Sequence, residues 1–261
     1  MNAPIEDYYK KSQDQKNHSF SDVIHVDDNM SLTWVELKKI APSFPRGWFE
    51  LVKLSKEDRR DFLRDFWLKQ LPYTPLTDNF IFCFFDKVED VTVFLTKQND
   101  SPYEVELVYS LYDDEGFFRG KPCSDNEIIT NVNHVFGNML PADFLSFCKI
   151  HNGFAKNFDT GILPIDKLQA YFDRLQSFIL EQNKSISIKN KDVDPSSLIP
   201  FYQDFGLNSF QCFYLDWYPG NSLGNVYYSG SDNTISNYLT DNIGFHSFID
   251  WLMFYLEEVI S

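Results

Sequence analysis

Apolar side chains recur with two different periods along this 261-residue chain, and the change between the periods constrains the fold. Residues 55–70 carry apolar side chains at helical spacing, whereas residues 103–111 alternate as in a strand with one buried face. The elements that these periods predict are, in sequence order, helices, strands, helices, strands and a closing helix. This order predicts an α+β fold, in which a mixed or antiparallel twisted sheet is flanked by helices.

The bounds of the expected elements follow from these periods and from capping and turn residues. We expect helices at residues 33–40, 55–70, 124–135, 141–151, 165–182 and 245–259. We expect strands at residues 80–85, 91–95, 103–111, 198–202, 209–215 and 225–228. The first of these is a continuous apolar run, which is typical of a strand buried on both faces. Thr33, Ser55 and Ser124 each precede an acidic residue by three positions, which is the spacing of a capping box.

The domain organisation is predicted from the absence of an obvious linker. Residues 1–26 are polar without a clear period, so we interpret them as a polar N-terminal arm. No Gly-, Ser- or Pro-rich stretch divides the rest of the chain, which predicts a single α+β domain over residues 27–261.

The charge of the chain limits the partners that it can bind directly. Its formal net charge is −15, which repels nucleic-acid phosphates and anionic membranes and favours basic proteins. No apolar run approaches the roughly 18 residues of a membrane span, and residues 1–20 lack the apolar core of a signal peptide. We therefore expect a cytoplasmic protein that binds neither nucleic acid nor membrane. The sequence does not predict its oligomeric state.

The cysteines do not form a recognisable metal site or disulfide framework. Cys83, Cys123, Cys148 and Cys212 are widely spaced and include no C-x-x-C pair. Phosphate-binding, dinucleotide-binding and hydrolase motifs are also missing from the sequence. We therefore predict four free thiols, no metal and no cofactor.

One group of residues raises the question of an enzyme. Cys148, His151 and Asn152 lie within five positions, and a nucleophilic cysteine site uses these residue types. Such groups usually converge from separate elements, and Cys148 lies on the apolar face of its expected helix. A core thiol and a histidine at a helix end explain the pattern better, so we predict no catalytic residue. A cysteine-dependent hydrolase remains a remote alternative.

The charge is distributed unevenly, and this asymmetry supplies the candidate binding residues. Residues 192–261 contain nine acidic and sixteen aromatic side chains and no Lys or Arg. An acidic, aromatic surface suits a basic protein partner, because charge steers the encounter and aromatic rings act as anchors. The competing interpretation is that most of these rings are core and the acids are scattered. The candidate contacts are Asp204, Asp216, Trp217, Tyr218 and Asp232, with Asp113, Asp114 and Glu115 as second choices.

Several short motifs in the second half of the chain resemble those of a known family. They are the Leu-Pro helix Leu140-Pro141-Ala142-Asp143-Phe144, the ending His151-Asn152-Gly153-Phe154, the strand residues Ile199-Pro200-Phe201 with Asp204, then Phe210, Cys212 and Tyr214, and the closing Phe248-x-x-Trp251-Leu252. With these motifs, residues 140–256 resemble the SUKH superfamily, in particular the branch named after the yeast cell-wall-assembly regulator.

The resemblance implies a non-enzymatic α+β domain that binds proteins. Many bacterial members of the superfamily resemble immunity proteins, which neutralise secreted toxins, and the yeast-type members resemble regulatory adaptors. We therefore expect an immunity-like module that binds a basic toxin or nuclease, with a cytoplasmic regulatory adaptor as the alternative. Structural roles are expected for Leu140, Pro141, Asn152, Gly153 and Trp251.

Overall fold

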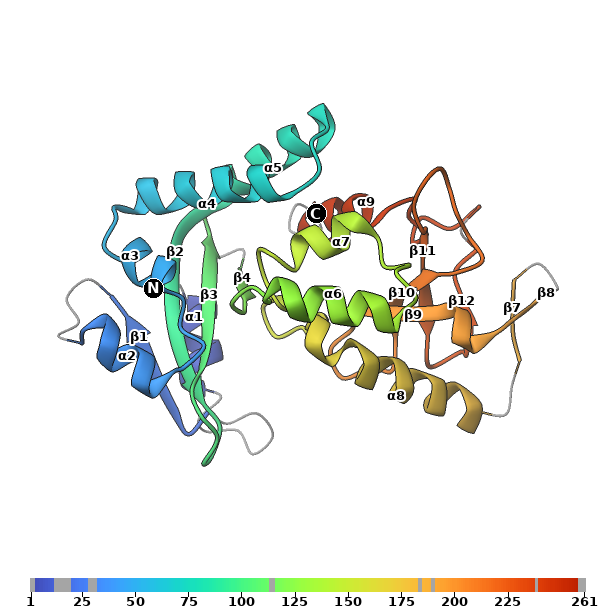
Figure 1. Cartoon of the computed structure of the whole chain (residues 1–261), viewed down its shortest axis with the longest axis horizontal. Coiled ribbons are helices and arrows are strands. Elements are labelled where there is room, and N and C mark those ends of the chain that lie inside the picture. The colour runs from blue at the N-terminus through green and yellow to red at the C-terminus, as the bar shows by residue number, and fades with distance from the viewer. Residues whose placement is uncertain are drawn as a thin grey trace. The chain divides into compact units, whose positions relative to one another are not determined.

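The chain divides into two compact units (Figure 1). Unit 1 comprises Met1–Cys123 and Phe154–Phe158, and unit 2 comprises Ser124–Gly153 and Asp159–Ser261. The computed structural model describes residues 3–11, 20–27, 32–112, 116–182, 185–188, 191–237 and 239–257. The assignment of residues 27–261 to one domain stays a prediction.

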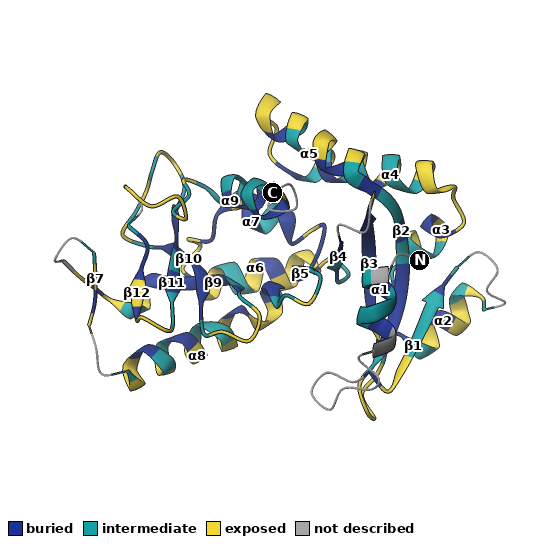
Figure 2. Ribbon diagram, turned by 180° about the vertical axis from the view of Figure 1, so that it is seen from behind, coloured by how far each residue is buried: buried dark blue, intermediate teal, exposed yellow. Residues whose placement is uncertain are grey.

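Unit 1 contains an antiparallel sheet and a set of helices. Its strands, in sheet order, are β1 (Asp22–Val26), β2 (Val88–Lys97), β3 (Glu104–Leu111), β4 (Phe117–Gly120) and β5 (Phe154–Lys156). Its helices are α1 (Ala3–Glu6), the π-helix η1 (Asp7–Lys11), α2 (Trp34–Ile40), α3 (Arg46–Leu51), α4 (Lys56–Gln70) and α5 (Pro75–Lys87). Figure 2 shows that β3 is buried along nearly its whole length.

Residues 80–85 correct one prediction, because they belong to α5 and not to a buried strand. Pro75 occupies the first turn, and Thr74 caps the helix by accepting a hydrogen bond from the backbone N–H of Thr77 at 3.0 Å. The buried side chains of α5 are Thr77, Ile81, Phe84 and Phe85, which is helical spacing. Phe82 is 43% exposed, so the apolar run conceals a one-sided helix.

The N-terminal residues also differ from the predicted arm. Residues 3–11 are helical, and Ile5 and Tyr9 are each only 2% exposed in a core cluster with Phe94 and Phe117. The Tyr9 hydroxyl donates to Glu106 Oε2 at 2.8 Å. This buried segment has a polar sequence around its two apolar anchors, which explains why composition alone suggests an arm.

Unit 2 also contains antiparallel strands. Its strands, in sheet order, are β6 (Gly161–Ile162), β9 (Leu198–Gln203), β10 (Phe210–Tyr214), β11 (Asn225–Ser229) and β12 (Thr234–Ile235), and a separate hairpin pairs β7 (Ile186–Ile188) with β8 (Lys191–Val193). Its helices are α6 (Asn126–Val135), α7 (Ala142–Phe147), the 3₁₀ turns η3 (Ile165–Lys167) and η4 (Pro195–Ser197), α8 (Leu168–Glu181) and α9 (Phe248–Glu257). The predicted α+β fold is confirmed, with antiparallel pairing of neighbouring strands.

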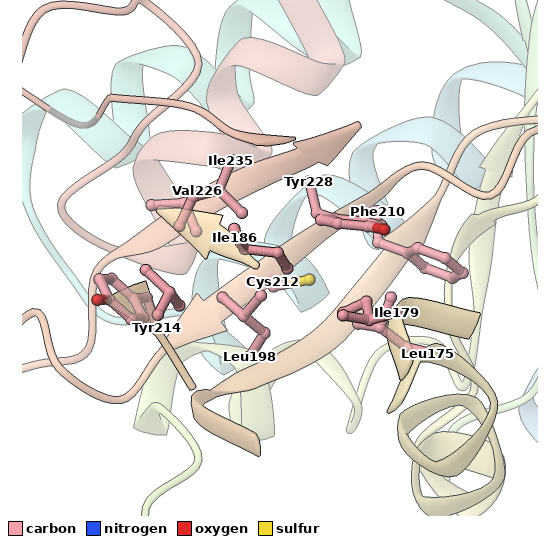
Figure 3. Close-up of a cluster of buried hydrophobic side chains, with 11 residues drawn as sticks. Leu175, Ile179, Ile186, Leu198, Phe210, Cys212, Tyr214, Val226, Tyr228 and Ile235 are labelled. Atoms are coloured by element: carbon pink, nitrogen blue, oxygen red, sulfur yellow. The ribbon is translucent and has the colours of Figure 1, made fainter. Parts of the chain in front are cut away.

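Helices cover both faces of the strands β9 and β10. On one face, Leu175 and Ile179 of α8 pack against Leu198 and Cys212 in the cluster drawn in Figure 3. On the other face, aromatic side chains of α7 and α9 surround Phe201 and Phe213, whose rings stack at 4.3 Å. The strands are therefore buried from both sides, and phenylalanine supplies much of the second core.

The two ends of the Leu-Pro helix connect to other parts of unit 2. Leu140 is buried and Pro141 is the N-cap residue of α7. Asn152 Oδ1 accepts a hydrogen bond from the backbone N–H of Ile165 at 2.7 Å, which fixes the start of η3. Gly153 has a φ of +96°, a conformation that favours glycine. A Cβ atom at this position would lie 3.1 Å from Pro164 Cγ.

The buried Asp143 joins the same helix to the closing helix. Its Oδ2 accepts a hydrogen bond from the backbone N–H of Ile249 at 3.0 Å, in the first turn of α9. Burial raises the pKa of this carboxyl, and the bonded N–H groups partly offset that effect. Asp143 thus satisfies a helix-end donor that would otherwise be left unpaired.

We predict that Gly153→Val lowers the free energy of unfolding of unit 2 by about 1 kcal/mol or more. The positive φ disfavours any side chain, and the new Cβ atom also presses on Pro164. Gly220→Val is the matched control, because Gly220 also has a positive φ but no atom lies within 4 Å of the place that its Cβ would take. Urea unfolding should show the larger loss for Gly153→Val, and equal losses would refute the role of the Pro164 contact.

Candidate functional site

A row of polar side chains crosses three strands of unit 2. Tyr202 of β9 and Tyr227 of β11 both lie opposite Gln211 of β10. Cross-strand partners share a face of the sheet, so these three side chains point the same way. A β-bulge leaves Phe201 as an extra residue between Pro200 and Tyr202, and it brings both Phe201 and Tyr202 into contact with Trp251 of α9.

This row forms one wall of a pocket of about 160 Å³. The pocket lies within unit 2, between the strands, α9 and the segment that precedes α9. Its lining consists of Tyr202, Asp204, Gln211, Tyr227, Ile243, Phe245, Trp251, Phe254 and Tyr255. Six of these nine side chains are aromatic, and one is a carboxylate.

Tyrosine hydroxyls hold two carboxylates at the pocket. Tyr227 donates to Asp204 Oδ2 at 2.5 Å. Tyr202 and Tyr255 both donate to Asp159 Oδ2, at 2.8 Å and 3.1 Å. The hydroxyl protons of all three tyrosines are therefore committed to acidic acceptors.

The electrostatics of the site reflect two neighbouring acids in a half-buried setting. Burial raises the pKa of Asp159, and the charge of Asp204 adds to this effect, while the tyrosine hydrogen bonds oppose it. Burial and the bond to Asp204 raise the pKa of Tyr227 to about 12. Burial and the nearby acids also raise the pKa of Tyr202. The tyrosines therefore stay protonated and keep donating at neutral pH.

The orientation of the Gln211 amide is fixed by its neighbours. Its Nε2 donates to Asn225 Oδ1 at 2.7 Å and to the backbone carbonyl of Ile243 at 3.0 Å. Asn225 is oriented in turn because its Nδ2 donates to the carbonyl of Ser247 at 2.9 Å. Backbone carbonyls only accept, so both amides have one permitted orientation.

The structure brings only some of the predicted contact residues together. Asp204 lines the pocket, and Asp232 is exposed in the turn after β11. Asp216 and Tyr218 are exposed beyond Tyr214, at the opposite end of β10. The length of β10 separates the two groups by about 14 Å, at about 3.4 Å per residue. They do not form a single patch with Asp204.

The remaining candidates have different surroundings. The ring of Trp217 is half-buried against the core cluster, and a Cβ atom on Gly224 would overlap it. Trp217 is thus a packing residue of the loop between β10 and β11. Asp113, Asp114 and Glu115 lie outside the described residues. The partner-binding role of the whole set stays a prediction.

Sequence reasoning missed most of the pocket. The sequence pattern marks Tyr202 and Tyr227 only as aromatic residues of strands, and it does not single out Gln211 or Asp159. The sequence did contain one signal: Tyr202, Gln211 and Tyr227 each end in a polar group, and they lie on the same face of the sheet. Reading that signal requires the strand register, including the bulge at Phe201.

Cys148 and His151 lack the environment of a reactive pair. Cys148 is 2% exposed and His151 is 1% exposed. Burial raises the pKa of the Cys148 thiol well above its ordinary range, whereas a nucleophilic cysteine needs a stabilised thiolate. In the described part of the chain, no group of three or more His, Cys, Asp or Glu side chains is placed to hold a metal ion. No described helix is long and apolar enough to span a membrane.

We predict that Asp159→Asn changes the pH dependence of stability. The pKa of Asp159 is raised in the folded protein, so its contribution to stability is present at low pH and is lost as pH rises through the folded pKa. Urea unfolding between about pH 3 and pH 6 should show the wild type losing stability relative to the variant as pH rises. Parallel curves for the two proteins would contradict the assignment.

We also predict that iodoacetamide labels the folded protein at Cys83 and Cys123 but not at Cys148. The first two thiols are exposed and Cys148 is buried, so only unfolding should make it react. Mass spectrometry of the labelled peptides, with and without urea, measures this difference. Rapid stoichiometric labelling of Cys148 in the folded chain would revive the hydrolase alternative.

Comparison with known proteins agrees with the motif analysis. Residues 122–252 match the SMI1 / KNR4 family (SUKH-1). The matched segment begins before residue 140, where the resemblance was predicted to begin, and it includes α6. All pocket residues except Phe254 and Tyr255 lie inside the matched segment. No curated protein and no solved structure shows significant similarity to the chain. The match covers half of the sequence, and the chain belongs to the SMI1 / KNR4 (SUKH-1) family.

Proposed function

We propose that this chain is a non-catalytic protein-binding module that recognises a basic protein through the acidic, aromatic surface of unit 2. The observation that carries the proposal is the pocket, where a carboxylate and six aromatic rings meet and no lining residue is Lys or Arg. Residues 192–261 contain no Lys or Arg, so a cation for this surface has to come from elsewhere.

Physical arguments favour a protein partner with positive charge. The net charge of −15 accelerates encounters with a basic protein and slows those with nucleic acids. Aromatic side chains in a partly enclosed site supply the binding energy that exposed ion pairs do not. The burial of Cys148 and His151 supports a module without catalysis.

The immunity version of this function is the more specific proposal. In it, the partner is a toxin or nuclease whose basic surface normally holds phosphate groups. The carboxylates of unit 2 then occupy the place of those phosphates. The four free cysteines support the cytoplasm, a reducing compartment, as the site of this interaction.

The proposal predicts a salt-sensitive complex that depends on acids of unit 2. The tagged chain, used as bait in a lysate of its host, should capture a basic protein at about 50 mM salt and release it at about 500 mM, because salt screens charge pairs. Asp204→Lys and Asp216→Lys, tested separately, should show which end of β10 contributes. Asp100→Lys is the control, since Asp100 is an exposed acid in unit 1 and its reversal changes the net charge equally.

We expect capture to fall about tenfold or more with at least one unit 2 reversal and to persist with Asp100→Lys. Expression of the captured protein alone should be toxic, and co-expression of the chain should relieve the toxicity. A neutral partner that survives high salt and both unit 2 reversals would contradict the proposal and favour a regulatory adaptor.

A further inference from the structure

We infer that the pocket of unit 2 binds a single arginine of the partner protein. This inference rests on the proposed function and specifies what the pocket contributes to it. Three features of the pocket support it: its size, its aromatic walls and the hydrogen-bonding groups that its own residues leave unused.

The size of the pocket suits a small planar group. Its volume is about 160 Å³. An engineered protein cavity of about 150 Å³ admits benzene, which has six heavy atoms in a plane. The guanidinium group of arginine is also planar and has four heavy atoms, so it fits with part of its aliphatic stem.

The aromatic walls favour a cation. Trp251 stacks on Tyr255 with ring centroids 5.1 Å apart, and Tyr202 packs against both rings at 5.1 Å and 5.2 Å. Phe245 and Phe254 pack together at 5.1 Å in the same lining. Aromatic faces attract cations, and guanidinium does so most often because it can also stack.

One amide oxygen and one carboxylate oxygen of the lining accept no hydrogen bond from a described residue. Gln211 is 2% exposed, and both hydrogens of its amide are donated to Asn225 and Ile243. Within the described residues no donor reaches Gln211 Oε1, and none reaches Asp204 Oδ1, since Tyr227 bonds to the other oxygen of that carboxylate. Gln211 Oε1 is not one of the buried side-chain atoms that lack a partner, so it keeps some accessible surface and can accept a hydrogen bond from a ligand or water.

Most hydrogen-bond donors of the lining already bond to groups of the protein, so the ligand has to supply the donors for new hydrogen bonds. The hydroxyls of Tyr202, Tyr227 and Tyr255 all donate to carboxylates. The indole N–H of Trp251 is the remaining side-chain donor in the lining. A ligand rich in acceptors, such as a carboxylate or a phosphate, therefore finds a poor match.

Arginine fits this set of groups better than other cations. A quaternary ammonium satisfies aromatic walls but has no N–H for Gln211 Oε1 and Asp204 Oδ1. A lysine ammonium has N–H groups but is compact, strongly hydrated and unable to stack. Guanidinium offers five N–H groups in one plane, with two flat faces for the rings.

The test uses small probes on the intact chain. N-acetyl-L-arginine amide is titrated into ¹⁵N-labelled protein, and the indole N–H signal of Trp251 is followed. N-acetyl-L-lysine amide has a positive charge but no planar group, and N-acetyl-L-citrulline amide has a planar group but no charge. We expect saturable binding of the arginine probe, at least threefold weaker binding of the lysine probe and at least tenfold weaker binding of the citrulline probe.

Two variants locate the binding in the pocket. Asp204→Asn keeps an acceptor for Tyr227 but removes the charge, and it should weaken the arginine probe about tenfold. Asp125→Asn removes an exposed charge of unit 2 that is neither in the pocket nor a candidate contact, and it should leave binding unchanged. The other tryptophan indole signals report whether each variant is folded. Equal affinity for arginine and citrulline probes, or a Trp251 signal that does not move, would overturn the inference even if no variant folds.

The result separates this inference from the proposed function. If the arginine probe fails to bind while partner capture stays salt-sensitive and is lost with Asp216→Lys, the arginine pocket is wrong and the proposed function stands. If the probe binds as expected while capture is insensitive to both Asp204→Lys and Asp216→Lys, the pocket is right and the proposed binding surface is wrong.

Discussion

The antiparallel ladder of β9, β10 and β11 is the constraint on which unit 2 depends. Because side chains alternate along a strand, each face of this ladder presents a separate set to the helices that cover it. The cluster with α8 closes one face with apolar side chains. The other face is closed by phenylalanines near α7 and becomes polar toward Tyr202 and Tyr227, where α9 leaves a pocket. The candidate site is therefore the part of this face that the core side chains do not fill.

The carboxylate of Asp204 determines the chemistry of that pocket, whose lining contains no Lys or Arg. In most proteins, partly buried acids are paired with Lys or Arg, but residues 192–261 contain neither. Tyrosine hydroxyls take that role here, and they stabilise the negative charge without neutralising it. The pocket thus keeps a net negative charge inside aromatic walls. Such an environment lowers the stability of the free protein and favours the binding of a cation. The stability of unit 2 is thereby linked to its proposed function.

Much of the fold could be predicted from sequence, because helix periods and strand alternation are local. The helix after Thr33 has the predicted capping box, and the strands expected at residues 91–95 and 103–111 correspond to β2 and β3, which pair with each other. The helix after Ser124 begins at an N-cap without a side-chain bond. The strand predicted at residues 80–85 was wrong, because six consecutive apolar residues show no helical period although they belong to a helix. The pocket could not be predicted, since it depends on a bulge and on pairing between strands distant in sequence. Charge asymmetry identified Asp204, but not the tyrosines that hold it.

Hydrogen exchange of the complex with its captured partner locates the binding surface on the chain without relying on substitutions. Binding at the pocket should slow the exchange of backbone amides at residues 202–204, 225–229 and 243–255, which border the lining. Peptides of unit 1 should exchange at the same rate with and without the partner. Protection confined to unit 1, with the pocket segments unchanged, would contradict the account of unit 2 as the surface that binds the basic partner.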